Sequence, residues 1–430
     1  YKVLDALTTG THNVAIGAYA GDAMTTASAN TLIGTSAGSA LTTGIQNTVV
    51  GKSALITATT ANDNTAIGFY ALDVNSSGAG NTAVGQNALG ANTTASNNVA
   101  VGLSALLANT TGASNVAVGA YSLDAATTAT DNTAVGYASL GAATTGGSNV
   151  AMGKGALEKN TTGTTNVAIG AGAMVENLTT SNNTALGYYA LKVNVAANNT
   201  AVGASALTAN TTGHSNVAVG TGASTAVTTA NHTTALGRNA LYANTTAANN
   251  TAIGSHALYT NTTSTGNTAV GYGALNLATS ANNTAVGTNA GANISTGASN
   301  TAMGTSALNA NTTGEQNTAV GSAALDASST GDKNTAIGYN ALTANTTADF
   351  NVAIGRGAMT TNTTGAGNTA VGTASLDGNS TGNYNTAVGY NCLLTNSTAA
   401  DNTAVGYNAL SLNATTANNT AVGRSALANN

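Results

Sequence analysis

Five tyrosines are the side chains of this sequence best suited to bind another molecule. Each directly follows a glycine of a recurring motif, and they are Tyr137, Tyr272, Tyr339, Tyr390 and Tyr407. Basic residues occupy the same place after other copies of that glycine, at Lys52, Lys154, Arg238, Arg356 and Arg424. Because aromatic faces stack on sugars, an exposed tyrosine stripe could contact a carbohydrate receptor. The alternative is a solvated stripe that only shields the core.

A second possible chemistry is N-glycosylation. Asn-Thr-Thr sequons recur along the chain, and we take as candidate acceptors Asn92, Asn109, Asn210 and Asn311. The alternative is that a chain so rich in Asn and Thr contains such triplets by composition alone.

No arrangement of residues indicates catalysis. His12, His214, His232 and His256 have no recurring carboxylate or nucleophile beside them, so we expect exposed polar side chains. The aspartates never form the Gly-Gly-x-Gly-x-Asp calcium repeat. Cys392, the sole cysteine, stands where most repeats have Ala, which predicts a small core residue. We therefore expect no enzyme, no cofactor and no metal site.

These residues are carried by one repeated unit. The pentapeptide Asn-(Thr/Val)-Ala-(aliphatic)-Gly occurs 25 times, with Thr233 replacing its Asn once and Leu32 and Val49 replacing its Ala. The period, counted in residues from one glycine to the next, is 17, except from Gly187 to Gly203 and from Gly271 to Gly287, where it is 16. A fixed period of this length is typical of a solenoid rather than of a compact enzyme.

We number each repeat so that this glycine is position 17. Position 14 is always Thr or Val and position 16 always aliphatic, which predicts a short strand that ends in a turn. Positions 14 and 16 then share one face, and positions 13, 15 and 17 share the other. If position 16 points into the coil, the Ala at position 15 indicates that a partner chain or a second layer packs closely on the second face. The alternative is that Ala and Gly merely suit a tight corner.

A second apolar anchor is Ala-Leu at positions 3 and 4, as in Ala71-Leu72. Four repeats lack this Leu but gain an aliphatic residue at position 7, and the pairs are Gly21 with Met24, Gly38 with Leu41, Ser224 with Val227, and Gly291 with Ile294. We infer that positions 4 and 7 reach the same core volume. Positions 7 to 10, often Asn-Thr-Thr-Gly, predict a turn, and stacked Asn at position 13 predicts a ladder of side-chain amides.

The predicted fold is therefore all-β: a repetitive parallel β-solenoid or β-roll of 25 coils, with about 17 residues per coil. It forms one continuous array over residues 1–430, which we expect to associate into a homo-oligomeric rod. Neither end of the sequence carries the polar cap that solenoids need, so we expect a fragment of a longer fibre or a unit that continues into another copy.

Composition limits the partners. Only 5% of residues are charged and the net charge is -5, so the clustered cations that nucleic-acid binding needs are missing. No apolar stretch is long enough to cross a membrane. We expect neither nucleic-acid binding nor membrane insertion.

The motif resembles known fibrous proteins. Asn13-Val14-Ala15-Ile16-Gly17 is similar to the head repeats of trimeric autotransporter adhesins, and the unit from Asn402 to Leu410 resembles shaft repeats of bacterial and phage tail fibres. The resemblance covers essentially the whole chain and implies a trimeric β-roll. Adhesin heads use a shorter coil, and this sequence shows no neck, stalk, anchor or chaperone domain of those families.

The sequence thus favours an extracellular structural fibre or adhesin shaft, on a cell surface or a virion, that serves attachment. Its partners would be copies of itself, as a homotrimer or an end-to-end filament, and a host-surface carbohydrate or protein receptor. The alternatives are an ice-binding solenoid, because position 14 is Thr in 18 of 25 repeats, and a single-chain polymerising surface filament.

Overall fold

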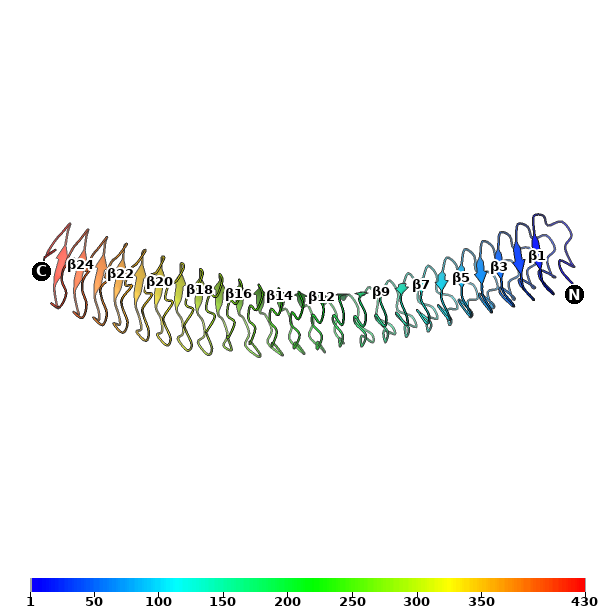
Figure 1. The fold of residues 1–430 in the computed structure, drawn as a ribbon. Helices are drawn as coiled ribbons and strands as arrows, with labels where there is room; N and C mark the ends of the chain where they lie inside the picture. The colour runs from blue at the N-terminus through cyan, green and yellow to red at the C-terminus, as the bar shows by residue number, and fades with distance from the viewer. Residues whose placement is uncertain (1, 430) are drawn as a thin grey trace. The chain divides into compact units, whose positions relative to one another are not determined.

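The computed structural model describes residues 2–429. In these residues short parallel β-strands alternate with turns, and there is no helix (Figure 1). The chain is a β-solenoid with one three-residue strand per repeat, so the predicted fold class is confirmed. It divides into two compact units, Tyr1–Ser215 and Asn216–Asn430, which we describe one at a time.

Every strand occupies positions 14 to 16 of its repeat. The first unit contains β1 (Val14–Ile16), β2 (Thr31–Ile33), β3 (Thr48–Val50), β4 (Thr65–Ile67), β5 (Thr82–Val84), β6 (Val99–Val101), β7 (Val116–Val118), β8 (Thr133–Val135), β9 (Val150–Met152), β10 (Val167–Ile169), β11 (Thr184–Leu186) and β12 (Thr200–Val202). The second unit contains β13 (Val217–Val219), β14 (Thr234–Leu236), β15 (Thr251–Ile253), β16 (Thr268–Val270), β17 (Thr284–Val286), β18 (Thr301–Met303), β19 (Thr318–Val320), β20 (Thr335–Ile337), β21 (Val352–Ile354), β22 (Thr369–Val371), β23 (Thr386–Val388), β24 (Thr403–Val405) and β25 (Thr420–Val422).

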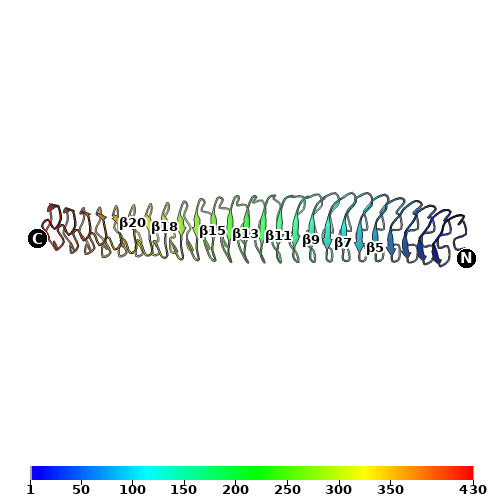
Figure 2. The same ribbon diagram turned by 90° about the horizontal axis from the view of Figure 1, so that it is seen from above.

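Strands of successive coils stack in register within each unit (Figure 2). Thr82 of β5 lies between Thr65 of β4 and Val99 of β6, so each repeat position forms a column along the stack. The backbone bonds to both neighbours: the amide of Thr82 donates to Asn98 O at 2.8 Å, and that of Gly85 donates to Ile67 O at 2.8 Å. The β-branched residues at position 14 suit this extended backbone.

The direction of the strand side chains corrects one prediction. The residue at position 15 is buried inside its own coil in β2 to β25, where it is Leu32, Val49 and otherwise Ala, whereas positions 14 and 16 point outward and are half-buried or exposed. Ala is required because the coil is too thin for a larger residue facing the Leu column. The restriction at position 15 therefore needs no partner chain, and the interface that we assigned to the Ala-Gly face is wrong.

Glycine at position 17 has a separate cause. Gly85 has a φ of +137°, and a Cβ added there would lie 2.4 Å from the carbonyl oxygen of Gly102 in the next coil. Both the backbone conformation and the close approach of the stacked backbones exclude a side chain.

The Leu of position 4 is the main apolar residue of each coil. Leu72 is fully buried and has a φ of +54°, a left-handed conformation that a branched residue adopts only at a cost. The same conformation recurs at this position in most coils, where burial of the side chain offsets the strain.

The structure confirms the exchange between positions 4 and 7. Gly21 and Gly291 occupy position 4, and a Cβ at either glycine would lie close to the buried aliphatic residue at position 7: 2.6 Å from Met24 Sδ and 2.9 Å from Ile294 Cδ1. Leu32, the one Leu at position 15, extends into the same vacated space, with its Cδ1 2.7 Å from the Cβ site of Gly21. A third column therefore takes part in filling the core.

A double-mutant cycle at Leu55 and Ala58 tests this exchange. Both side chains are buried at positions 4 and 7 of one coil, and Ala58 has no side-chain polar group to lose. We expect Leu55→Gly to destabilise the first unit by about 2 kcal/mol, because the cavity costs more than the relief of backbone strain returns. Ala58→Leu alone should also destabilise by overpacking. Combined, they should recover more than half of the loss, measured by hydrogen exchange as the free energy of local opening at these coils. Simple additivity of the two changes would contradict a shared volume.

The predicted amide ladder at position 13 is present. Asn98 receives a hydrogen bond at its Oδ1 from the side chain of Asn115 at 3.2 Å and from the Asn115 amide at 2.9 Å. Asn at position 7, which we expected in a turn, is also buried and forms a second ladder: Asn109 Nδ2 donates to Asn92 Oδ1 at 3.0 Å. The interior of each coil is therefore partly made of hydrogen-bonded amides.

The two shorter repeats keep the strand register. Thr184 pairs with Thr200 in the first unit, and Thr268 pairs with Thr284 in the second, although the members of each pair are one residue closer in sequence than those of other pairs. The missing residue is thus absorbed outside the strand, as loop backbone tolerates.

Candidate binding surfaces

The five tyrosines of the predicted stripe are all exposed, with Tyr272 the most open at 59%. They lie at position 1, directly after the turn glycine, where the chain has left the strand. Tyr137 belongs to the first unit and the other four to the second. The prediction that position 1 reaches the surface is confirmed, whereas its receptor stays a prediction.

These tyrosines contact different neighbours. Tyr390 and Tyr407 stack with their ring centroids 5.4 Å apart, and the guanidinium of Arg424 lies 5.6 Å from the Tyr407 ring. Tyr137 has Lys154 Nζ 6.0 Å from its ring centroid. Cations over aromatic faces of this kind help to hold the rings in place.

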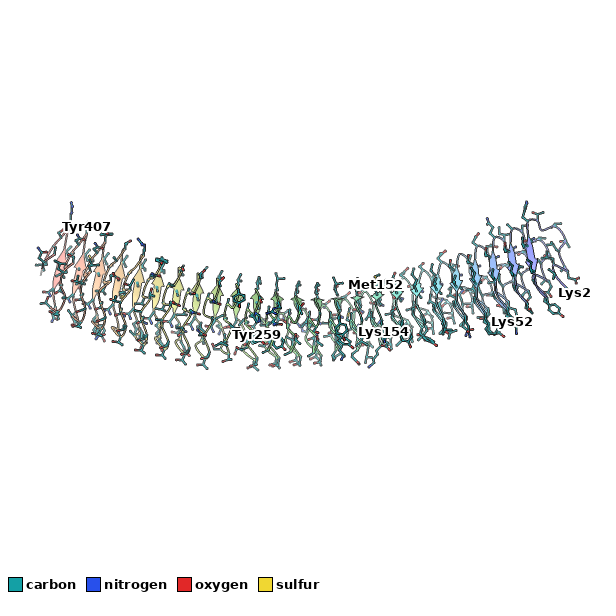
Figure 3. The ribbon with its side chains drawn as sticks, in the orientation of Figure 1. Lys2, Lys52, Met152, Lys154, Tyr259 and Tyr407 are labelled. Atoms are coloured by element: carbon teal, nitrogen blue, oxygen red, sulfur yellow. The ribbon has the colours of Figure 1, made fainter. Side chains whose placement is uncertain are left out.

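The outward face of the strands is the larger surface, and we call it the strand face: positions 14 and 16 of each unit. It contains only Thr or Val at position 14 and only Val, Ile, Leu or Met at position 16, with no charge in any of the 25 strands. Ile67 is 38% exposed, and Leu186 is similarly open. Met152, which Figure 3 labels, is also exposed. The period-two pattern indicated that positions 14 and 16 share one face of the strand, but we had placed the aliphatic residues of position 16 in the interior.

The four candidate glycosylation sites are buried. Each lies at position 7, and its Nδ2 donates to the carbonyl oxygen three residues later, at 2.8 to 3.0 Å, in Asn92, Asn109, Asn210 and Asn311. A glycan on that nitrogen would remove the hydrogen bond and cannot be accommodated inside the coil. The geometry therefore disfavours glycan attachment at these four residues in the folded chain.

The remaining reactive side chains are dispersed. Between residues 2 and 429 no three His, Cys, Asp or Glu side chains come together as metal ligands would. Cys392 is buried, with its Sγ 2.7 Å from Gly406 O, and burial raises the pKa of its thiol. His12, His214 and His232 are exposed, and His256 is half-buried beside tyrosines.

Four carboxyl groups at position 5 are partly desolvated. Burial raises the pKa of each above its usual value, and the four are Asp73, Asp124, Asp326 and Asp377. In the folded protein the protonated form is therefore favoured relative to the unfolded chain. Stability from this source is fully present below the ordinary aspartate pKa and is lost as the pH rises through the raised folded pKa.

Asp326 allows this pH dependence to be tested, because its Oδ1 is buried without a hydrogen-bond partner. Asp326→Asn removes the ionisation, so we expect the melting temperature at pH 7 to rise by roughly 1–3 °C and its increase on acidification toward pH 4 to shrink. The exposed Asp401→Asn serves as the control and should change neither. A lower melting temperature for Asp326→Asn at pH 7 would contradict the assignment.

Comparison with known proteins adds no relative: no family model matches the chain, and neither does any curated protein. Among the described residues, no helix is long and apolar enough to cross a membrane.

Proposed function

We propose that this protein is a structural shaft of an extracellular fibre or adhesin, built from several copies of the chain joined through their strand faces. The observation that supports this most is the uncharged, outward-facing column of aliphatic residues at position 16. Soluble monomers rarely expose contiguous apolar patches of this extent. Burying the column against a partner would remove that apolar surface from water.

The periodicity of the strand face favours an identical partner. Its side chains repeat at the spacing of stacked strands, about 4.8 Å, in every coil of each unit. Only a surface with the same spacing can remain in step over many coils, and another copy of the chain supplies it. The resemblance of the motif to adhesin and tail-fibre repeats favours three copies, and an extracellular location on a cell surface or virion.

A charge placed on the strand face tests the proposal. We expect Ile67→Lys combined with Ile337→Lys, one change in each unit, to dissociate the oligomer in light scattering, because an ammonium would be buried between copies. The matched control is Leu103→Lys with Leu277→Lys, which are similarly exposed in the single chain but lie outside the strand face. Equal effects of the two pairs on the mass would contradict an interface at the strand face.

An ice-binding function is the second candidate, because the Thr column of position 14 faces outward and stacks in register, as Thr65 does on Thr82. The neighbouring aliphatic column and the seven Val at position 14 count against it. A thermal hysteresis assay separates the two: the shaft proposal predicts no hysteresis at micromolar protein.

A further inference from the structure

One arrangement of position-1 residues occurs once in each unit. In four successive coils, position 1 holds Tyr, a cation, a small residue and Tyr again. The first unit has Tyr137, Lys154, Ala171 and Tyr188. The second has Tyr339, Arg356, Thr373 and Tyr390, with the same sequence separation from the first Tyr to the last.

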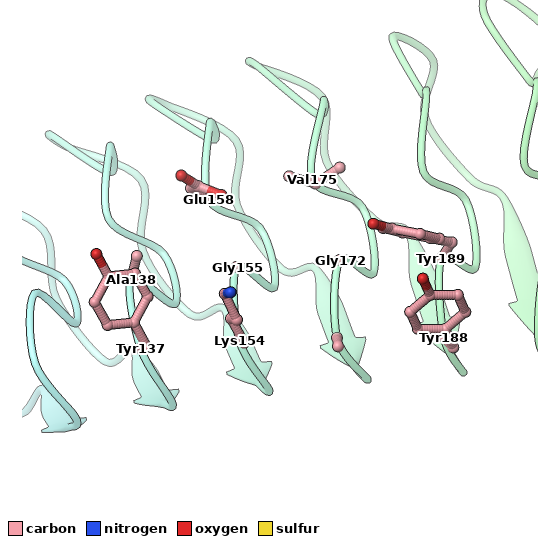
Figure 4. Close-up of a pocket in the computed structure, with 10 residues that line it drawn as sticks. Tyr137, Ala138, Lys154, Gly155, Glu158, Gly172, Val175, Tyr188 and Tyr189 are labelled. Carbon is pink, nitrogen blue, oxygen red and sulfur yellow. The ribbon is translucent and has the colours of Figure 1, made fainter.

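In the first unit this arrangement forms a pocket of about 380 Å³ (Figure 4). Tyr137 and Tyr188 stand at its two ends, three coils apart, with Lys154 between them. The small residues Ala171 and Gly172 leave the space open. A volume of this size lies within the range of small-molecule sites.

Two glycines at position 2 shape the pocket wall. A Cβ at Gly155 would lie 2.9 Å from Glu158 Oε2, and a Cβ at Gly172 would lie 2.3 Å from Cε1 of Tyr189. Because these two glycines have no side chain, the carboxylate of Glu158 and the ring of Tyr189 pack directly against their backbone. The pocket therefore presents aromatic faces, an ammonium and a carboxylate to the same space.

The second unit repeats this chemistry on a smaller scale, in a pocket of about 200 Å³. Tyr339 bounds it, Arg356 is followed by Gly357, and Asp377 supplies the carboxylate, held by a hydrogen bond from Thr360. Tyr390 lies one coil beyond Thr373 and stacks on Tyr407.

The charged groups of both pockets are available to a ligand. Among residues 2–429 the ion pairs are Lys2 with Asp5 and Lys159 with Glu176, so neither pocket cation is neutralised by its pocket carboxylate. Each pocket holds one positive and one negative group, which gives it no net charge. A neutral ligand rich in hydroxyl groups can accept from the cation and donate to the carboxylate, whereas for an anionic ligand the repulsion by the carboxylate offsets the attraction by the cation.

We infer that the two pockets are sites for a neutral oligosaccharide, one in each unit, in which sugar rings stack on Tyr137 and Tyr188 in the first unit and on Tyr339 in the second. The apolar face of a pyranose matches a tyrosine ring, and its hydroxyls reach the flanking cation and carboxylate. This inference goes beyond the proposed shaft and does not depend on it, because each pocket is built within one chain.

Calorimetric titration of the full chain tests the inference with maltohexaose, cellohexaose, xylohexaose and chitohexaose as neutral probes and hexagalacturonate as the acidic probe. We expect at least one neutral probe to bind at two sites per chain. Tyr137→Ala should remove one site and Tyr339→Ala the other, each weakening its site at least about tenfold, as loss of a central aromatic contact does. The matched control is Tyr272→Ala, which changes an exposed position-1 tyrosine that lines neither pocket.

Removing the pocket carboxylates gives a second test, because it should strengthen the binding of an acidic probe, and a folding defect cannot strengthen binding. Glu158→Gln with Asp377→Asn leaves each pocket positively charged, so binding of hexagalacturonate should strengthen at least about tenfold. Failure of all four neutral probes to bind, an equal loss in Tyr272→Ala, or unchanged hexagalacturonate binding would overturn the inference. None of these results bears on the mass of the oligomer, so the shaft proposal is tested separately.

Discussion

Gly85→Ala is expected to cost about 4–6 kcal/mol, the largest effect that we predict. The residue has a φ of +137°, which only glycine adopts readily, and this strain alone costs about 1–3 kcal/mol. The new Cβ would also lie 2.4 Å from Gly102 O, a backbone atom that is fixed by the next coil. The two stacked coils must separate to admit it, so their shared hydrogen bonds weaken as well.

Hydrogen exchange of the amides in β5 and β6 measures this cost. Long repeat arrays do not unfold in one step, whereas local opening at a given coil has a defined free energy. The control is Gly141→Ala in the same unit, where φ is not positive and the nearest atoms lie 3.4 Å from the added Cβ. Unchanged protection around Gly85→Ala would show that the backbones do not stack as closely as described.

Asn115→Ala is expected to cost about 3–5 kcal/mol, the second largest effect. The side-chain amide donates to Asn98 Oδ1 at 3.2 Å and to Ala129 O at 2.8 Å. Its Oδ1 accepts from the backbone amide of Asn132 at 3.1 Å and from its side chain at 3.2 Å. Truncation leaves the carbonyl of Ala129 and the backbone amide of Asn132 without these bonds, whereas Asn98 Oδ1 keeps the bond from the Asn115 backbone amide. Each unsatisfied buried group costs about 1–3 kcal/mol before relaxation.

Asn115→Thr should cost about half as much. Thr233 shows why, because its hydroxyl replaces the amide in the same ladder and donates to Asn216 Oδ1 at 2.7 Å. The control is the exposed Asn97→Ser, at a position where Ser114 occurs one coil later. Hydrogen exchange across β6 to β8 reports the loss, and equal protection in Asn115→Ala and Asn115→Thr would contradict a ladder that depends on hydrogen bonds.

The sequence predicts the fold well because each repeat position samples one environment many times. The strand at positions 14 to 16, the Asn13 column and the exchange of Leu for Met24 or Ile294 were all visible as restricted columns, and the structure confirms them. A position restricted to a few residue types shows that its side chain packs against other atoms. It does not show whether that side chain faces the interior of the coil or a surface outside it.

That ambiguity explains the main error. Ala at position 15 and aliphatic residues at position 16 are both restricted, and we placed the larger residue inside because burial of larger apolar residues is usual. The coil is instead so thin that Ala faces inward, opposite Leu72 and its equivalents, and the aliphatic residue faces out. The left-handed backbone of the Leu itself had no sequence signal, because branched residues normally avoid it.

The pockets could not be predicted from single columns either. They depend on which residues occupy position 1 in four successive coils and on a glycine beside the cation, at Gly155 and Gly357. The tyrosine stripe was visible in the sequence. The small residues between its tyrosines form a pocket only when the coils are stacked.

The proposed shaft requires that copies of the chain associate through their strand faces. Sedimentation equilibrium of the unmodified chain at micromolar concentration tests this association most directly. One chain has a mass of 41.2 kDa. We predict a single species of three times that mass, stable on dilution, in which the strand faces are buried against one another. A stable, isolated monomer at the same concentration would contradict the proposed shaft.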